Sequence, residues 1–289
     1  MASPPESPAE SATESSTGSV HATGRPSQRA IFRAAVRTGV ADYRRSYTWK
    51  SWTFGWLLRC LLEVTFYGLI GVLLNSRETG LYLLVGRGFY LGTQEVMWVI
   101  QSTAWERSAG TLPLLVSAPG RVWVVFAGRS TQWLPSAIAT SAIALFTVAP
   151  AFGLHYSVAG VFTVLLAVPI AVLSSYCFAL PIAALVLRRP SWRNLASNVT
   201  HGVMGLLCGV FVPVSFWPTP VQVFAQIFPV THALDGLRSG VAIGGTVADA
   251  LPGLGLALLV GLCWLAIGAL LLEQFAEGAR RDGSIDLDS

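Results

Sequence analysis

The chain has 289 residues, of which 53% are hydrophobic and only 12% are charged, and its mean hydropathy is +0.58. An ordinary soluble domain carries about 25% charged residues, so this composition excludes that class and indicates a protein of the lipid bilayer. The formal net charge of +4 does not indicate nucleic-acid binding, because the basic residues stand beside apolar segments, where membrane topology places them.

The first segment, residues 1–28, is rich in Ser, Pro, Glu, Thr and Gly and nearly free of large apolar residues. Such a segment cannot bury enough apolar surface to offset the entropy of ordering it. It also starts polar and acidic, whereas a signal peptide starts basic and continues apolar. We therefore expect an uncleaved, disordered cytoplasmic tail.

The segment 29–50 has the pattern of an amphipathic helix. Apolar and aromatic residues recur at intervals of three and four. The neighbouring stripe is basic and consists of Arg29, Arg33, Arg37 and Arg44. A helix of this kind lies in the membrane interface, with its arginines toward anionic lipid. The alternative is a soluble helix that packs on another subunit.

Six apolar segments follow, each about as long as a membrane span, which needs roughly 20 apolar residues. They are 52–74, 81–103, 122–151, 158–187, 195–217 and 251–272. Backbone that crosses lipid must satisfy its own hydrogen bonds, so we expect these spans to be helices. The predicted fold is an all-α polytopic membrane protein, with a transmembrane domain over 51–273 and a cytoplasmic C-terminal tail over 274–289.

The basic residues predict which side of the membrane each connection faces. Most arginines precede the first span, flank the second connection, fill the fourth or follow the last, whereas the opposite side keeps mainly Arg77 and Arg238. Cytoplasmic connections carry the excess of Lys and Arg, so both termini are expected in the cytoplasm. Arginine far exceeds lysine, and Ala, Gly and Val are abundant, a composition associated with GC-rich bacteria. The expected location is a bacterial inner membrane.

The stretch 218–243 is too interrupted by proline for a span and too apolar for a solvated loop. We expect two short helices, near 220–227 and 231–241, that dip back into the outer leaflet. Broken backbone at that depth must be buried by protein or line a cavity. Asp235 and Arg238 are three residues apart on the second of these helices and are expected to pair.

Charged residues inside the spans are candidates for function, because a charge in lipid is costly. Arg59 and Glu63 are four residues apart in the first span and can neutralise each other. Candidates for a translocation pathway are two charges of the second span and aromatic residues of the second and fifth spans, namely Arg87, Phe89, Tyr90, Glu95, Trp98, Phe216 and Trp217. The alternatives are structural ion pairs, snorkelling side chains and ordinary packing.

The sequence contains no recognisable catalytic, metal or nucleotide-binding motif. Its histidines and cysteines are scattered, without the spacing of a metal site. A phosphate-binding loop needs glycines ahead of a lysine, and the only lysine, Lys50, has none directly before it. If ATP drives this protein, a separate chain must bind it.

Taken together, the basic helix, the six segments, the charged stretch 104–118 and the motif before the last span resemble the ABC-2 type family of ABC transporter permeases. In that family a short cytoplasmic coupling helix with an E-R-x-x-G-T-L pattern follows the second span. The pattern is matched by Glu106, Arg107, Gly110, Thr111 and Leu112. The proline and arginine of the family's re-entrant helices are matched by Pro229, Asp235 and Arg238. Pro113 departs from the glutamate that often follows G-T-L.

The resemblance implies a transmembrane permease subunit of an ATP-driven exporter for an amphiphilic, lipid-linked, polysaccharide or drug-like substrate. It also implies a second permease, identical or related, and two cytoplasmic ATPase subunits that hold ATP and magnesium, so that this chain needs no cofactor of its own. The implied docking residues are Glu106, Arg107, Gly110, Thr111, Leu112, Leu114 and Leu115.

The alternative function is an ion- or proton-coupled secondary transporter, in which the intramembrane residues Arg87 and Glu95 form the relay. Such a transporter would depend on a proton gradient and would have no associated ATPase. Internal repetition between halves is typical of that class, and none is visible in this sequence.

Overall fold

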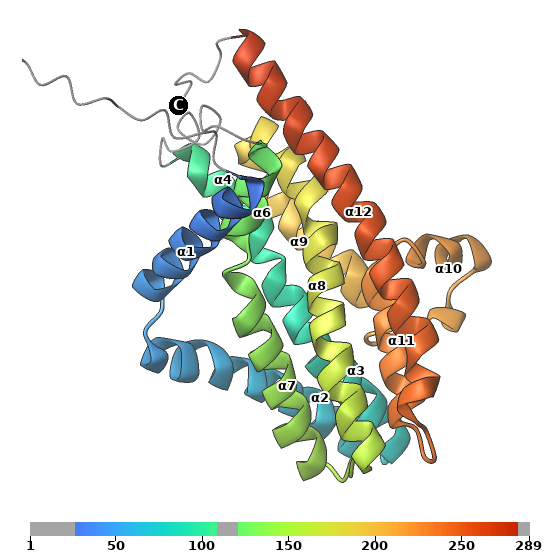
Figure 1. Cartoon of the computed structure of the whole chain (residues 1–289). Coiled ribbons are helices and arrows are strands. Elements are labelled where there is room, and N and C mark those ends of the chain that lie inside the picture. Colours follow the sequence, from blue (N-terminus) through green and yellow to red (C-terminus); the bar gives the residue numbers. More distant parts are fainter. Residues whose placement is uncertain (1–26, 109–120, 283–289) are drawn as a thin grey trace, which may run out of the picture.

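The computed structural model describes residues 27–108 and 121–282, and the regular elements in these two ranges are all helices. The expected all-α class is therefore confirmed for the described part of the chain. Figure 1 shows α7, α8 and α12 side by side, with α11 packed against α12. In chain order the elements are α1 Gln28–Ser46, η1 Ser51–Leu57, α2 Leu58–Leu73, α3 Arg77–Val96, α4 Trp98–Ser108, α6 Val122–Ser130, α7 Trp133–Ala151, α8 Val158–Arg188, η2 Pro190–Trp192, α9 Arg193–Leu207, η3 Val214–Phe216, α10 Thr219–Ala225, α11 Pro229–Val241 and α12 Val247–Asp282.

Within the described ranges, four helical stretches are long and apolar enough to cross a membrane. They are Ser51–Leu73, Val122–Ala151, Val158–Arg188 and Val247–Gly278. They correspond to the first, third, fourth and last predicted spans. Helix α3 is less apolar because it includes charged residues, and α9 has only 15 residues, fewer than the roughly 20 that a span needs. The total of six crossing helices therefore stays a prediction.

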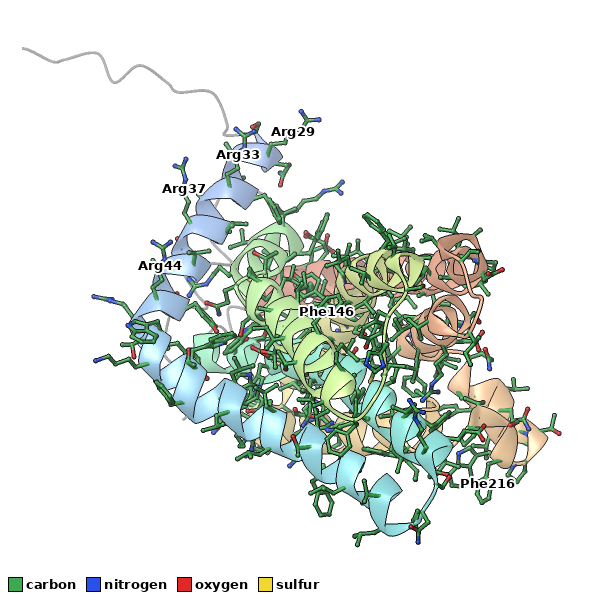
Figure 2. The ribbon with its side chains drawn as sticks, turned by 90° about the horizontal axis from the view of Figure 1, so that it is seen from below. Arg29, Arg33, Arg37, Arg44, Phe146 and Phe216 are labelled. Atoms are coloured by element: carbon green, nitrogen blue, oxygen red, sulfur yellow. The ribbon has the colours of Figure 1, made fainter. Side chains whose placement is uncertain are left out.

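Helix α1 occupies most of the predicted amphipathic segment. Its first turn is capped by Ser27, whose hydroxyl accepts a hydrogen bond from the Ala30 amide at 3.2 Å. Two small buried residues, Ala35 and Gly39, let α1 lie closely on α6. Figure 2 shows the four labelled arginines on the side of α1 that faces away from the other helices. The helix and its basic face are thus present, and its place in the membrane interface stays a prediction.

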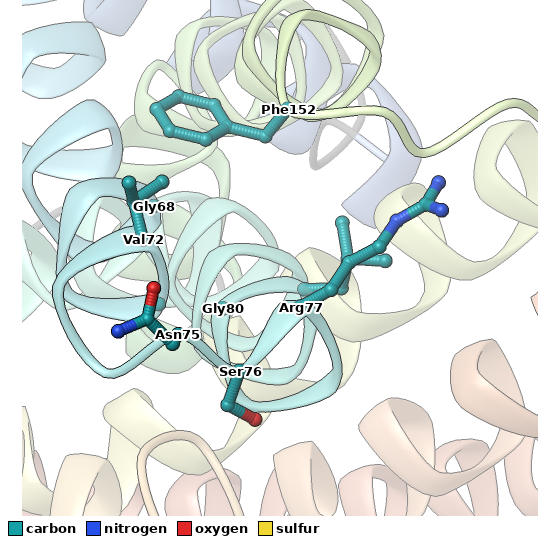
Figure 3. A pocket seen from close by; sticks show the side chains of 9 residues that line it. Gly68, Val72, Asn75, Ser76, Arg77, Gly80 and Phe152 are labelled. Carbon is teal, nitrogen blue, oxygen red and sulfur yellow. The ribbon is translucent and has the colours of Figure 1, made fainter.

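Helices α2 and α3 form a tight hairpin. Gly71 and Gly80 bring the two backbones so close that a Cβ on either glycine would overlap the other residue. The turn between them contains Asn75 in the left-handed region, at φ 50°, a conformation that asparagine tolerates better than most residues. Beside the hairpin is a pocket of about 330 Å³, bordered by Gly68 and Phe152 (Figure 3). Arg77 closes this end by donating to the Gly153 carbonyl at 2.7 Å.

Two of the predicted spans are interrupted. The second breaks at Met97, which lies between the end of α3 and the start of α4 and whose amide bonds to the Gln94 carbonyl at 3.2 Å. The third breaks at Thr131 and Gln132, between α6 and α7. Figure 1 shows α4 and α6 near the same end of the molecule, beside α1. Each break therefore leaves a short helix, α4 or α6, with packing partners of its own.

The fifth predicted span, 195–217, is wrong in its second half. Helix α9 ends at Leu207, and the chain then turns through Gly209, which adopts φ +84°. A positive φ is easily reached by glycine and stops a right-handed helix. The Gly209 carbonyl, freed from the helix, accepts hydrogen bonds from Tyr82 and Arg238, both at 2.8 Å. Apolar composition alone did not reveal this stop.

The two short helices expected before the last span are present as α10 and α11. Helix α11 starts with Pro229 and buries most of one face against α8 and α12. Helix α10 is more exposed, with Val223 at 65%. Their position as helices is as expected, whereas their re-entry into the outer leaflet stays a prediction. Helix α12 then runs unbroken to Asp282, beyond the predicted end of the last span.

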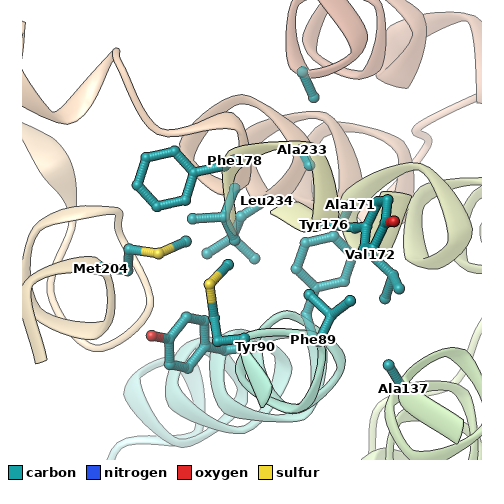
Figure 4. Close-up of a cluster of buried hydrophobic side chains, with 14 of the residues drawn as sticks. Phe89, Tyr90, Ala137, Ala171, Val172, Tyr176, Phe178, Met204, Ala233 and Leu234 are labelled. Carbon is teal, nitrogen blue, oxygen red and sulfur yellow. The ribbon is translucent and has the colours of Figure 1, made fainter. Parts of the chain in front are cut away.

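The apolar core lies where α3, α8 and α11 meet. Phe89 of α3 packs toward Val172 and Tyr176 of α8, and Leu234 of α11 fills the neighbouring space (Figure 4). Large residues in this cluster are almost fully buried, with Phe89 and Leu234 each 1% exposed. This core fixes α3 in place, and α3 carries the charged residues that concern function.

Candidate functional site

Helix α3 carries two buried charged residues eight positions apart. Arg87 is 4% exposed and Glu95 is 2% exposed. Both come from the segment predicted to be the second span, where a buried charge is costly and must be compensated. The two side chains have different partners, so they form two separate sites.

The first site is an ion pair between α2 and α3. One terminal nitrogen of Arg87, Nη2, donates to Glu63 Oε1 at 2.6 Å and to Gln94 Oε1 at 2.7 Å. The guanidinium also lies 5.7 Å from the centre of the Tyr90 ring. The predicted pairing of Glu63 with Arg59 is wrong, because the more deeply buried arginine takes the carboxylate. The Arg59 guanidinium instead lies over the Trp56 ring, at 5.1 Å from its centre.

Helix α9 closes this site from a third side. The Tyr90 hydroxyl donates to the His201 carbonyl at 2.8 Å, which joins α3 to α9. Gln94 and His201 were not predicted. The spacing offered a signal for Gln94, because it follows Arg87 by seven residues and so lies on the same helical face. Nothing in the sequence indicated His201. We name the group of Glu63, Arg87, Gln94, Tyr90 and His201 the α3 ion-pair site.

The second site surrounds Glu95. Trp56 Nε1 donates to Glu95 Oε2 at 3.1 Å, and the Ser136 hydroxyl donates to Glu95 Oε1. Ser136 in turn accepts from Trp52 Nε1 at 2.6 Å. These donors are neutral, and among the described residues no cationic side chain forms an ion pair with Glu95. A buried carboxyl group therefore rests on neutral hydrogen-bond donors alone.

Six aromatic rings enclose this carboxyl group, and we name them the aromatic cage. They are Tyr43, Tyr47, Trp52, Trp56, Trp98 and Trp133. They come from α1, the connection after it, η1, α4 and α7. The rings fill the space so completely that no water-sized gap remains between them.

The rings also pack on one another. Tyr43 and Tyr47 stack at 5.0 Å between ring centres, and Tyr43 meets the edge of Trp133 at 5.7 Å. Trp98 stacks on Trp133 at 6.0 Å. Burial, and to a lesser degree the negative charge of Glu95, raises the pKa of Tyr47, so its hydroxyl stays protonated at neutral pH. Tyr43 at the end of α1 and Tyr47 just after it cover one side of the site, and the other rings come from predicted spans.

The remaining pathway candidates lie elsewhere. Phe89 belongs to the apolar core (Figure 4). Phe216 and Trp217 lie near α10, where their rings meet edge to face at 5.3 Å, and Phe216 is 70% exposed (Figure 2). No described contact joins these two residues to Arg87 or Glu95. The predicted pathway set is therefore divided among several places, and whether its members line a pathway stays a prediction.

Arg238 of α11 forms a junction with α3 rather than the expected pair with Asp235. Its Nη1 donates to the Tyr82 hydroxyl at 2.9 Å and to the Gly209 carbonyl at 2.8 Å, and its guanidinium lies 3.7 Å from the Tyr82 ring centre. The predicted Asp235–Arg238 ion pair is absent from the described contacts. Asp235 is exposed, whereas Arg238 turns inward to a ring and a carbonyl that the helix stop supplies.

The predicted docking residues fall mostly outside the structure's description. Helix α4 ends at Ser108, so Glu106 and Arg107 belong to its last turn. Their side chains lie outside the described part of the chain. The same holds for Gly110, Thr111, Leu112, Leu114 and Leu115. Their role stays a prediction.

A family model for the ABC-2 type transporter matches residues 40–242. The chain belongs to the ABC-2 type transporter family. The match covers more than half of the ABC-2 chain and includes the α3 ion-pair site, the aromatic cage and Arg238. A search of individually curated proteins found no significant match. The resemblance inferred from the motifs is thereby confirmed, and the chain is an ABC permease of the membrane.

Proposed function

We propose that this ABC-2 permease is the transmembrane subunit of an ATP-driven exporter that moves an amphiphilic, lipid-linked, polysaccharide or drug-like substrate outward. The observation that carries the proposal is the family match over residues 40–242, which includes the helices from α2 to α11. The family implies ATPase partners. Two such subunits would supply ATP and magnesium, and a second permease, identical or related, would complete the transporter in a bacterial inner membrane.

Helix α4 is suited to pass on motion from a docked ATPase. It is set off from α3 by the break at Met97 and leads toward the predicted docking segment. It also packs against α6, α8 and α9. A displacement of α4 would therefore reach several helices at once. ATP can drive this change only if the ATPase binds α4 differently in the two states of the permease.

The outward surface of the helices is consistent with a lipid environment. Helix α2 exposes Leu62, Phe66 and Leu73 at 61%, 59% and 80%. Helix α12 exposes Leu262 and Leu270 at 59% and 64%. Apolar rows of this size are unfavourable in water and are covered by lipid or by a second permease.

The geometry does not favour the alternative of an ion- or proton-coupled relay through Arg87 and Glu95. The two residues share no hydrogen bond among the described contacts. Arg87 is paired with Glu63, and Glu95 accepts from Trp56 and Ser136. Membership of an ATP-driven family supports the permease instead.

The test is to co-express the chain with its ABC ATPase, purify the complex and reconstitute it. Reversing the charge of Glu106 or Arg107 is expected to leave the chain inserted while ATP hydrolysis no longer drives transport. Glu78→Arg, at an exposed residue in the first turn of α3, is the matched control and should couple normally. Failure of any ATPase to co-purify, or full coupling in the charge-reversal variants, would contradict the proposal.

A further inference from the structure

Glu95 is a buried acidic residue that forms no ion pair with any described basic side chain. The carboxyl group is buried, yet its hydrogen-bond donors, Trp56 and Ser136, are neutral. A buried charge without a counter-charge is expensive, and such groups inside membrane segments mark functional sites by default. Arg87 shows that this helix can supply a counter-charge where one is needed.

The surroundings of Glu95 indicate which counter-charge is missing. Aromatic faces attract cations, and the attraction is stronger when the cation is removed from water. The polar edges of three indoles are already occupied, because Trp52 and Trp56 donate into the Glu95 network and Trp133 Nε1 donates to Ser102 at 3.3 Å. What remains for a ligand is ring surface and one carboxylate. This combination suits an organic cation and offers little to an anion.

We propose that Glu95 and the four tryptophans of the aromatic cage bind the onium group of an amphiphilic organic cation, and that Tyr43 and Tyr47 take its place when no ligand is bound. The onium group is a quaternary or tertiary ammonium, or a phosphonium, carried either by a free lipophilic cation or by a lipid headgroup. The inference deepens the proposed function, on which it rests for the role of the site in transport, by naming a substrate class.

Helix α1 is the wall that can move. It carries Tyr43, and Tyr47 follows directly after its last residue, whereas the other four rings come from η1, α4 and α7. Its links to α6 include a partly buried ion pair between Asp42 and Arg129, at 2.9 Å, and the close approach of Ala35 and Gly39. The chain leaves α1 at Tyr47 in an extended conformation, before η1 begins. Rotation about this connection would withdraw the two tyrosines without disturbing Trp52 or Trp56.

The outer side of the same region suits an amphiphile. Trp49 and Phe54 flank the cage in sequence and are 69% and 67% exposed. Their exposed rings belong to the same stretch of chain as Trp52 and Trp56 and provide an apolar surface that lipid can cover. A cation held beside Glu95 could therefore keep its apolar substituents in contact with aromatic rings and the surrounding lipid.

The test measures equilibrium binding of tritiated tetraphenylphosphonium to the purified full chain in detergent, without an ATPase. We expect saturable binding that unlabelled tetraphenylphosphonium displaces and the neutral triphenylphosphine oxide does not. Glu95→Gln should weaken binding at least about tenfold, whereas Glu78→Gln on the same helix should bind as the wild type does. Absence of saturable binding, or equal affinity in Glu95→Gln, would overturn the proposal.

A second pair of variants keeps the test decisive if Glu95→Gln does not give a monodisperse protein. Glu95→Asp retains the charge and should retain saturable binding, with reduced affinity. Trp98→Leu retains the carboxylate but removes one ring and should weaken binding several-fold. Unchanged affinity in Trp98→Leu would contradict a role of the aromatic rings.

The source of the onium group is distinguished by adding lipid. Phosphatidylcholine carries a quaternary ammonium, and phosphatidylglycerol does not. Displacement of the label by phosphatidylcholine alone would support the cage and assign a headgroup as its occupant, whereas no displacement by either lipid would support a free cation. Because no ATPase is present, failure of binding would overturn this inference and leave the proposed permease function standing.

Discussion

The two buried charged residues of α3, Arg87 and Glu95, have different kinds of partner, although the burial of either charge is unfavourable. Arg87 is neutralised by Glu63 from α2, supported by Gln94 and the Tyr90 ring. Glu95 has neutral donors and aromatic rings around it, with no cation in contact among the described side chains. Arg87 is neutralised within the fold, whereas Glu95 is the residue at which we propose that a ligand supplies the counter-charge. The difference separates a structural site from a binding site on one helix.

The largest expected effect comes from breaking the paired site. Glu63→Leu would leave the Arg87 guanidinium buried without a counter-charge, which costs about 3 kcal/mol, the low end of the range for such pairs because Glu63 is 37% exposed. Denaturation in detergent micelles measures the loss of unfolding free energy. The double variant with Arg87→Leu should recover most of it, and Glu78→Leu is the control. A cost no greater than that of the control would show that the pair is not structural.

A smaller effect is expected when one donor to Glu95 is removed. Trp56→Phe keeps an aromatic ring but deletes the Nε1 hydrogen bond to Glu95 Oε2. Leaving a buried acceptor short of a donor costs about 1–3 kcal/mol. Trp49→Phe, at an exposed ring, should change the unfolding free energy by no more than about 0.5 kcal/mol. Equal effects of the two variants would place Glu95 in a more solvated setting than the structure indicates.

The smallest effect concerns the wall that covers the cage. Asp42→Asn removes the partly exposed ion pair with Arg129 and should cost about 1 kcal/mol. Hydrogen exchange of the α1 amides should nevertheless rise, because α1 opens more often. Arg37→Gln, on the outward face in Figure 2, is the matched control and should exchange as the wild type does. Unchanged exchange in Asp42→Asn would show that other contacts hold α1 closed.

Local patterns predicted much of the fold. The periodicity of residues 29–50 indicated a helix, found as α1, and the prolines of 218–243 indicated two short helices, found as α10 and α11. The stop at Leu207 was missed, because it depends on Gly209 and on hydrogen bonds from Tyr82 and Arg238, which lie far away in the sequence. The composition of residues 195–217 does not indicate these hydrogen bonds.

The sequence also did not predict which residues the charged side chains contact. Spacing along one helix suggested Arg59 with Glu63 and Asp235 with Arg238, but burial favours partners from neighbouring helices. Glu63 turns to Arg87, and Arg238 turns to Tyr82. The aromatic cage likewise joins residues from 43 to 133, and the only hint was that Glu95 lay in a span without a basic residue one turn away.

The central claim is that ATP drives this permease to export a substrate that Glu95 recognises. The most direct measurement is ATP-dependent uptake of tetraphenylphosphonium into inside-out vesicles that contain the chain and its ABC ATPase. We predict uptake with the wild type and with Glu78→Gln, and loss of at least about nine-tenths of it with Glu95→Gln. Uptake that is equally fast in Glu95→Gln, or that proceeds without ATP, would contradict the account.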